Sequence, residues 1–539
     1  MNGLRSTSPF AEGDPKAPIL FVAEAPARWE MLKSQPLVGE SGQVFDECLH
    51  SAGIIRRLSS IANVSRVPIK DGSDYATDSG LTHKGLEARA DLYKRIEGHT
   101  PKVIVALGNV AAACLCPDFG RNRTISKIRG SLYWNDTLKC KVIPTLHPAS
   151  TLPGRGPYVN RYIIVADMKK AERESYFSEI RRLERMYLIR PTMGEALDFL
   201  QALHRTERVA LDIEIFNLQV SCLGLCASPT VGMCIPFSLG DKHYWQEDQE
   251  IVLWKAISNL LADAKVEKLW QYGMFDESFL LRHNKIIVKG KRHDSLVMHR
   301  ILYPDLPSKL EFICSMFSDI PYYKDDKKLW NRIKDAADTF FRYNINDVFS
   351  TWDGAEAMLP LIEADESYSW TYRNTMSLWD PCLFAMERGV KVDRDKMRVL
   401  QDSTRADIEK KEGEFKQACD MEINPASSKQ VISYFYAHKG IPPYKNRKTH
   451  APTCDDEALS RIVRKYNYPE ARILQELRGL HKLRDAYLDM EFDPDGRLRC
   501  FYDIRGTTTG RLSSKKTIAG TGLNMQNLDP RFLSFIVPD

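Results

Sequence analysis

The chain has 539 residues, room for about three domains, and its 43% hydrophobic and 27% charged content is that of a globular protein. A net charge of +5 permits nucleic-acid binding without requiring it, and no apolar run is long enough to span a membrane. The N-terminus lacks an apolar signal core and the 12 cysteines form no CxxC pair, so we expect a cytoplasmic protein with reduced thiols.

Residues 18–165 alternate short apolar runs with helical stretches, which predicts an α/β sheet. The runs ILFVAEAP, KVIVALG and KVIPTLHP each indicate a strand that ends in a loop. Glu24 follows the first run, Asn63 ends the strand of IANVSRVP, and His147 follows the last. The glycines of QPLVGESGQVFDECL let the backbone approach a ligand closely.

In this order, and together with ISKIRGSLYW, these motifs resemble uracil-DNA glycosylases of the family 4 type. The resemblance implies an α/β/α sandwich that flips a base out of DNA, placed with its connector at residues 1–185. It also implies that Glu24 lies near the flipped sugar, that Asn63 reads the uracil edge, and that His147 stabilises the leaving uracil anion.

Three departures from that family concern its pocket and its cofactor. The family has Gly where Ala27 stands and a stacking Phe where Leu37 stands. It also binds an iron–sulfur cluster through four cysteines, but the N-terminal CxxC is absent here and Val67 occupies the place of a third. We therefore expect no iron–sulfur cluster. Two hypotheses stay open: an active glycosylase, and a non-catalytic module that binds DNA and senses uracil.

A second α/β segment, residues 186–365, contains the strand RVALDIEIF, whose Asp212 and Glu214 leave the same face. Such a pair is either a solvent-exposed feature of a strand edge or a ligand set for a hard cation such as Mg²⁺. Asp276 follows an apolar run, and KRHDSLVMHRIL contributes Asp294. Tyr343 and Asp347 lie four residues apart, on one face of a predicted helix.

As an ordered set, these residues resemble the DEDDy 3′–5′ proofreading exonucleases, whose fold is ribonuclease H-like. The resemblance implies that Tyr343 orients the attacking water and that two divalent ions (Mg or Mn) are held by Asp212, Glu214, Asp276 and Asp347. The family usually carries Asn where Tyr272 stands, but that Asn is not a metal ligand, so we expect activity to survive. The alternatives are a nuclease-inactive DNA-binding accessory protein and a stand-alone nuclease that processes RNA.

Residues 366–539 are predicted to be mostly helical. In NPASSKQVISYF, Ser427 and Gln430 have the spacing of a capping box. Further on, the glycine-rich basic loop TTTGRLSSKK can present backbone N–H groups and a guanidinium to phosphates, and the amides of GLNMQNLDP can reach bases or sugars. The candidate DNA-binding residues are Arg511, Ser513, Asn524, Gln526 and Asn527.

These two motifs, with FAMERGVKVD, LHKLRDAYLD and DGRLRCFYDIRGT upstream, resemble family A DNA polymerases of the DNA polymerase I type, phage-like in their domain fusion. In that family the palm aspartates and the fingers helix lie beyond FLSFIVPD. We therefore expect a truncated chain that holds the thumb and the first palm segment, with Phe532 to Val537 as a strand. The missing palm and fingers would belong to the full-length protein.

The resemblances together predict an α/β multidomain polymerase with proofreading exonuclease activity. This chain alone would carry out at most metal-dependent 3′–5′ exonucleolysis and DNA binding, without primer extension. Its expected partners are single-stranded DNA and primer–template DNA, with no membrane, in the cytoplasm of a bacterial or phage-infected cell.

Overall fold

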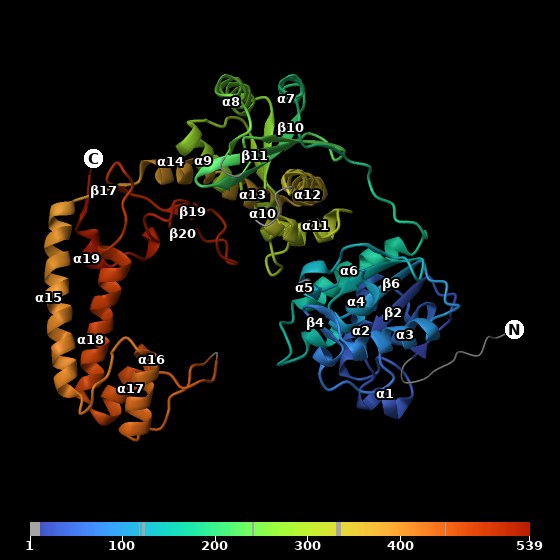
Figure 1. The fold of residues 1–539 in the computed structure, drawn as a ribbon, viewed down its shortest axis with the longest axis horizontal. Helices are drawn as coiled ribbons and strands as arrows, with labels where there is room; N and C mark the ends of the chain where they lie inside the picture. The colour runs from blue at the N-terminus through green and yellow to red at the C-terminus, as the bar shows by residue number, and fades with distance from the viewer. Residues whose placement is uncertain are drawn as a thin grey trace. The chain divides into compact units, whose positions relative to one another are not determined.

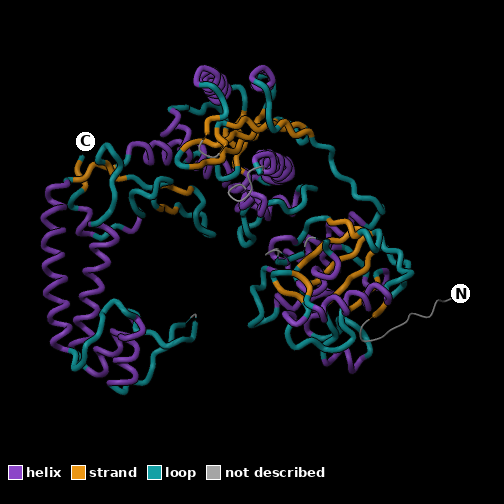
Figure 2. Tube along the Cα trace, viewed as in Figure 1, coloured by secondary structure: helices purple, strands orange, loops and turns teal. Residues whose placement is uncertain are grey.

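The computed structural model describes residues 11–117, 119–120, 124–239, 242–329, 336–447 and 449–538. Its contacts divide the chain into two compact units, Met1–Met376 and Ser377–Asp539. The first unit contains two separate β-sheets, each covered by helices, and the second unit is mainly helical (Figures 1 and 2). Within the described ranges, no helix combines the length and the hydropathy needed to cross a bilayer.

The N-terminal sheet has six strands in the order β1-β3-β2-β6-β8-β7. Its four central strands are parallel and its two edge strands are antiparallel to their neighbours. The strands are, in sheet order, β1 (Ala11–Glu12), β3 (Ser60–Asn63), β2 (Ile19–Ala23), β6 (Val103–Leu107), β8 (Cys140–Thr145) and β7 (Tyr133–Asn135).

Helices cover both faces of this sheet. Alternate residues of β2 point to opposite cores: Leu20 and Val22 to one, Ile19 and Phe21 to the other. The first core includes residues of α3 (His83–Arg95), α4 (Asn109–Leu115) and α5 (Ile125–Ile128), and the second includes residues of α2 (Glu40–Ala52) and α6 (Asn160–Glu174). The predicted α/β/α sandwich is therefore present.

The second sheet of this unit has the order β16-β15-β10-β11-β12-β9. Strands β10, β11 and β12 are antiparallel neighbours, whereas β15 pairs parallel with both β10 and β16, and β9 pairs parallel with β12. The strands are β16 (Arg292–Asp294), β15 (Glu267–Trp270), β10 (Arg208–Phe216), β11 (Gln219–Cys226), β12 (Val231–Pro236) and β9 (Met186–Leu188).

The long helix α12 (Ala337–Glu363) packs against β10, β11 and β12, on the side of the sheet away from α7 (Met193–Leu203) and α8 (Glu247–Ala262) (Figure 1). Gly224 of β11 permits this close approach, because a Cβ there would stand 2.6 Å from Oδ1 of Asn344. The remaining helices are α9 (Met274–Asn284), α10 (Ser295–Leu302), α11 (Leu310–Phe317) and α13 (Glu366–Met376).

In the second unit, the long helices α15 (Arg394–Ala418) and α18 (Pro469–Leu483) lie side by side (Figure 1). Ser427 caps α16 (Ser428–Ile432) as predicted, but Gln430 accepts from the N–H of Asn424 instead of completing a capping box. The other elements are α14 (Trp379–Arg388), α17 (Asp456–Tyr466), β17 (Val390–Val392), β18 (Arg497–Leu498), β19 (Phe501–Asp503) and β20 (Ser513–Lys515).

The prediction of one strand from Phe532 to Val537 is wrong. A short helix, α19 (Pro530–Leu533), comes first, because Asp529 caps it and proline favours the first helical position. Only β21 (Ile536–Val537) is a strand, paired antiparallel with β17. The apolar character of the run is explained by Phe532 and Phe535, which are buried in a core with Leu498.

Candidate functional sites

Three carboxylates meet between β10 and α12. Asp212 and Glu214 leave β10 on the same face, and Asp347 comes from α12. One carboxylate oxygen from each of the three lies within 4.8 Å of the others. Glu214 and Asp347 are buried and Asp212 is half-buried. The pair predicted from the strand pattern is therefore not a solvent-exposed edge pair.

The electrostatics of this cluster favour a cation. Burial and then the charges of Asp347 and Glu214 raise the pKa of Asp212 well above its usual range. Burial also raises the pKa of Glu214, although Lys327 acts in the opposite direction. Burial and mutual repulsion disfavour the charged forms of these carboxylates, and a bound cation would relieve both effects. Carboxylate oxygens are also the ligands that a hard divalent cation takes.

Asp276 and Asp294 are not members of this three-carboxylate group. Asp276 lies in the first turn of α9, where its Oδ1 accepts from the N–H of Ile213 at 3.0 Å and burial raises its pKa to about 8. Asp294 caps α10 and also accepts from the N–H of Gly273 at 2.9 Å, so it fixes the turn before α9. Tyr272 in that turn has φ 64°, a conformation that Asn adopts more readily than Tyr.

Two lysines enter the cluster, and sequence reasoning missed both. The Nζ of Lys324 lies 2.6 Å from Oδ1 of Asp347 and 3.1 Å from the hydroxyl of Tyr343. The Nζ of Lys327 lies 2.7 Å from Oε2 of Glu214. Their three-residue spacing in YYKDDKK is a weak signal, because charged runs of this kind are usually solvated.

Two further polar residues complete the cluster. Tyr323 donates its hydroxyl to Oδ1 of Asp347 at 2.5 Å. Asn344 donates from Nδ2 to Oδ2 of Asp212 at 2.8 Å. The sequence offers one signal for Asn344 as a site residue: it follows Tyr343 directly, on the helix predicted to carry both Tyr343 and Asp347.

In the N-terminal domain, Glu24, Asn63 and His147 follow or end three parallel strands of one sheet, β2, β3 and β8. Their side chains therefore start from the carboxyl edge, where ligands bind in open α/β sheets. Gly108 follows β6 at the same edge with φ 92°, and a Cβ there would lie 2.5 Å from Oε1 of Glu24 and 3.2 Å from Cβ of His147. The three predicted residues thus lie at one edge of the sheet.

His147 has a defined tautomer at this edge of the sheet. The N–H of Ala149 donates to its Nδ1 at 3.1 Å, so in the neutral ring the proton is on Nε2. Burial lowers the pKa of His147, which favours that neutral form. Leu37, expected at the stacking position, is buried in the core that contains Phe21 and Phe45.

The predicted DNA-binding residues near the C-terminus have mixed environments. Oδ1 of Asn524 accepts from Ser514 Oγ at 2.7 Å and from the N–H of Gln526 at 3.0 Å, so it mainly holds the turn. Asn524 and Asn527 line a cavity of about 620 Å³ that Lys515 also lines. Outside this cavity, Gln526 donates to a backbone carbonyl, Arg511 is exposed, and Ser513 begins β20.

Both ends of the chain are similar to known protein families. Residues 10–163 match the model of the uracil DNA glycosylase superfamily, and residues 394–531 match that of DNA polymerase family A. The type-4 uracil-DNA glycosylase of Archaeoglobus fulgidus is 37% identical over 146 residues, which are 26% of this chain and 69% of that protein. The DNA polymerase of Bacillus phage SP01 is 22% identical over 607 aligned residues, 94% of this chain and 62% of the polymerase.

A solved structure of the POL domain of Pol1 from M. smegmatis, in complex with DNA primer-template and dNTP, is 20% identical with a TM-score of 0.48. The match covers 64% of this chain and 56% of that one.

Through its N-terminal domain, the chain belongs to the uracil-DNA glycosylase superfamily. Within that superfamily its similarity is to the type-4 enzymes, and its residues 394–531 are similar to family A DNA polymerases. The chain spans less than two thirds of the phage DNA polymerase that it matches along nearly its whole length.

Proposed function

We propose that the chain is part of a family A DNA polymerase with proofreading, and that its own activity is metal-dependent removal of nucleotides from DNA 3′ ends. The observation that carries the proposal is the cluster of Asp212, Glu214 and Asp347, whose carboxylate oxygens lie within 4.8 Å of one another. The sheet around it, with three antiparallel strands followed by two parallel ones, suits a ribonuclease H-like domain.

The donor set fits divalent cations, because it consists of carboxylate oxygens with no thiol or imidazole, and burial raises the pKa of both Asp212 and Glu214. Asp212, Glu214 and Asp347 would hold the ions, and Asp276 of α9, which lies outside the closest group, would be a further ligand. Such ions supply activation of water and stabilisation of the leaving oxygen of a phosphodiester.

Tyr343 and Lys324 have complementary tasks in this proposal. Burial, then the negative charge of Asp347, raises the pKa of Tyr343 far above neutrality, so its hydroxyl stays protonated and can hold the attacking water by a hydrogen bond. The ammonium group of Lys324, 3.1 Å from that hydroxyl, can pair with a phosphate oxygen of the DNA. The expected substrates are single-stranded DNA and the frayed 3′ end of a primer–template.

The test is degradation of end-labelled single-stranded DNA with Mg²⁺, comparing the chain with an Asp212→Ala/Glu214→Ala variant. A matched control is Glu247→Ala/Asp248→Ala, which removes two exposed carboxylates from α8. We expect stepwise shortening from the 3′ end by the chain and the control only. If DNA is bound but never shortened, the nuclease proposal is wrong and a DNA-binding accessory role replaces it.

We further propose that the N-terminal pocket takes uracil from DNA. The neutral His147, with its proton on Nε2, can donate to a uracil oxygen from the edge where Glu24 and Asn63 also lie. Release of uracil from a uracil-containing duplex would indicate an active glycosylase. Tight, uracil-dependent binding without release would indicate a sensor, and an equal affinity for uracil-containing and uracil-free DNA would contradict the proposal.

A further inference from the structure

Residues 318–327, here called the bridging segment, run along the N-terminal domain and into the carboxylate cluster. Before the turn at Lys324–Leu329 the segment has no regular secondary structure. Two successive side chains go in opposite directions: Tyr322 packs against the core of the N-terminal domain, whereas Tyr323 donates to Asp347. The segment therefore contacts both domains of the first unit.

The N-terminal domain holds the start of the bridging segment through Lys170 of α6. The Nζ of Lys170 donates to the carbonyl oxygens of Gly130 at 2.8 Å, Ser315 at 3.3 Å and Ser318 at 3.2 Å. Ser131, the neighbour of Gly130, accepts from the N–H of Tyr322 at 3.2 Å through its hydroxyl. An ammonium with three carbonyl partners fixes the segment around Gly130 and the segment of Ser315 and Ser318 to each other.

Arg129 adds a buried contact at the same junction. It is 3% exposed, pairs with Asp167 through two nitrogens, and donates from Nη1 to Oγ of Ser315 at 2.6 Å. Gly130 has φ 72°, and a Cβ there would stand 2.7 Å from Asp167 and 3.1 Å from the carbonyl oxygen of Ser315. This close approach is thus possible only for a glycine.

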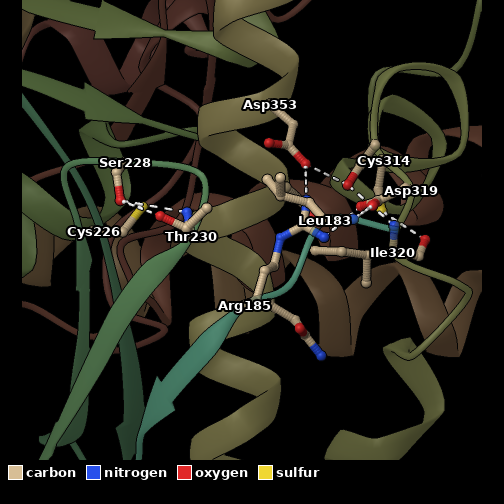
Figure 3. Close-up of polar contacts among 12 residues, drawn as sticks. Leu183, Arg185, Cys226, Ser228, Thr230, Cys314, Asp319, Ile320 and Asp353 are labelled. Atoms are coloured by element: carbon tan, nitrogen blue, oxygen red, sulfur yellow. Dashed lines mark hydrogen bonds and ion pairs between the residues drawn. The ribbon is translucent and has the colours of Figure 1, made fainter. Parts of the chain in front are cut away.

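The connector between the two domains holds the segment from its other side (Figure 3). Leu183 donates its N–H to Oδ2 of Asp319 at 2.5 Å, and Arg185 pairs with Asp319 as well. Arg185 also donates to Oδ2 of Asp353 on α12 at 2.8 Å, and Ser318 donates to the same oxygen. Figure 3 shows Arg185 between the two aspartates.

We propose that the glycosylase-like domain is a positioning part of the carboxylate site: Lys170 and Ser131 fix the bridging segment so that Tyr323 and Lys324 reach Asp347. The inference rests on the nuclease function proposed above. Ordering an irregular backbone costs conformational entropy, which the contacts of the bridging segment with the N-terminal domain, the connector and α12 together offset. The glycosylase-like domain supplies the contacts of Lys170 and Ser131 among these, so the two domains act as one unit during nucleotide removal.

Hydrogen–deuterium exchange on the full chain tests the placement without any need for activity. Lys170→Met removes the three bonds, whereas Lys169→Met changes an exposed lysine next to it on the same helix. We expect exchange in residues 318–327 to be faster in Lys170→Met but not in Lys169→Met. Exchange in the β strands of the N-terminal sheet should be unchanged in both variants. Equal exchange in the two variants would overturn the proposal.

Ser131→Ala gives a second, milder test that should leave the fold intact, because it removes one hydroxyl. It should speed exchange at Tyr322 and its neighbours in the same direction as Lys170→Met. Lys170→Arg keeps a cationic donor and should restore most of the protection, which a purely steric role of Lys170 would not predict.

Nuclease kinetics on end-labelled DNA then test the functional consequence. A displacement of about 1 Å can cost up to roughly 100-fold in rate, so we expect a 10- to 100-fold loss for Lys170→Met. The variant should also need more Mg²⁺ for half-maximal rate. In a double-mutant cycle, Lys170→Met should cause little further loss once Lys324→Met is present.

The outcomes separate this inference from the proposed function. Fully additive losses in the cycle would show that Lys170 acts independently of Lys324, and would overturn the inference. Absence of nuclease activity in every protein, with exchange still faster in Lys170→Met, would reject the nuclease proposal and leave the placement of the segment supported.

Discussion

At the scale of single residues, the protonation state of buried groups decides what each site can do. Tyr343 can donate to a water molecule only as a neutral phenol, and burial, followed by the charge of Asp347, raises its pKa and favours that state. His147 can donate to uracil only if its proton is on Nε2, and the backbone of Ala149 sets this tautomer. In both cases the surroundings of the side chain favour the protonation state that its proposed role requires.

Tyr343→Phe tests the role of the phenol. Loss of a positioned hydroxyl should lower the rate of nucleotide removal by at least about 10-fold, with little change in DNA affinity. Single-turnover kinetics with labelled DNA measures this, and Tyr368→Phe, which removes the hydroxyl of a 40% exposed tyrosine, is the control. A wild-type rate for Tyr343→Phe would remove Tyr343 from the mechanism.

His299 predicts a loss of stability in acid. It is fully buried beside Tyr303 and Phe312, neither ring nitrogen has a hydrogen-bond partner within the described ranges, and burial lowers its pKa to about 4. The unfolded chain, with an ordinary histidine pKa near 6.5, binds the proton first as the pH falls. The free energy of unfolding should therefore decrease between pH 6.5 and 4, by roughly 3 kcal/mol from this residue.

Urea denaturation of the first unit at several pH values measures the effect. His299→Phe should flatten the pH dependence in that window, whereas His83→Phe, at a side chain that is 90% exposed, should leave it unchanged. An identical slope for His299→Phe and the unmodified chain would contradict the assignment.

At the scale of elements, the site residues are positioned both by the geometry of single helices and strands and by the close packing between them. Helix α12 places Tyr343 and Asp347 one turn apart, and the absence of a side chain at Gly224 brings that helix down onto β11. In the N-terminal domain, strands in parallel register bring the loops after β2, β3 and β8 to one edge. Gly108 lies at the same edge, in close contact with both Glu24 and His147.

Gly108→Ala should weaken uracil recognition. The substitution combines a positive φ with a Cβ only 2.5 Å from Oε1 of Glu24, so Glu24 and His147 must move apart. Gly98→Ala is a matched control, because its φ is 86° but a Cβ there meets nothing within 4 Å. Both changes should cost about 1 kcal/mol of stability for the backbone, and only Gly108→Ala should weaken binding of uracil-containing DNA, measured by fluorescence anisotropy.

At the scale of the whole molecule, the chain consists of two compact units, and only the first contains the carboxylate cluster. Contacts such as those of Lys170 and Arg129 tie the two domains of that first unit to each other. A ligand of the cluster should therefore stabilise both of these domains together. The second unit should respond to magnesium much less.

Calorimetry of the full chain should show two unfolding transitions, one for each unit. Mg²⁺ at about 100 times its dissociation constant should stabilise only the transition of Met1–Met376, by roughly 3 kcal/mol and a few degrees, and EDTA should reverse the shift. Asp212→Ala/Glu214→Ala should lose the response. A magnesium shift in both transitions, or in neither, would contradict this division.

Local periodicity in the amino-acid sequence was enough to predict several features of the fold and of the sites. Alternation along RVALDIEIF placed Asp212 and Glu214 on one face, and a spacing of four placed Tyr343 and Asp347 on one helix side. Apolar strands followed by polar loops predicted the sandwich and the loops that carry Glu24, Asn63 and His147. These patterns are readable because a strand repeats every two residues and a helix every 3.6.

Contacts between groups that are distant along the chain became visible only in the folded structure. It brought Lys324 and Lys327 into the carboxylate cluster, kept Asp276 outside the closest group, and buried Leu37 in a core. It also joined Lys170 to the carbonyl of Ser318, which is 148 residues away along the chain. No periodicity encodes such contacts, because they arise from the way two separately folded sheets pack around an irregular segment.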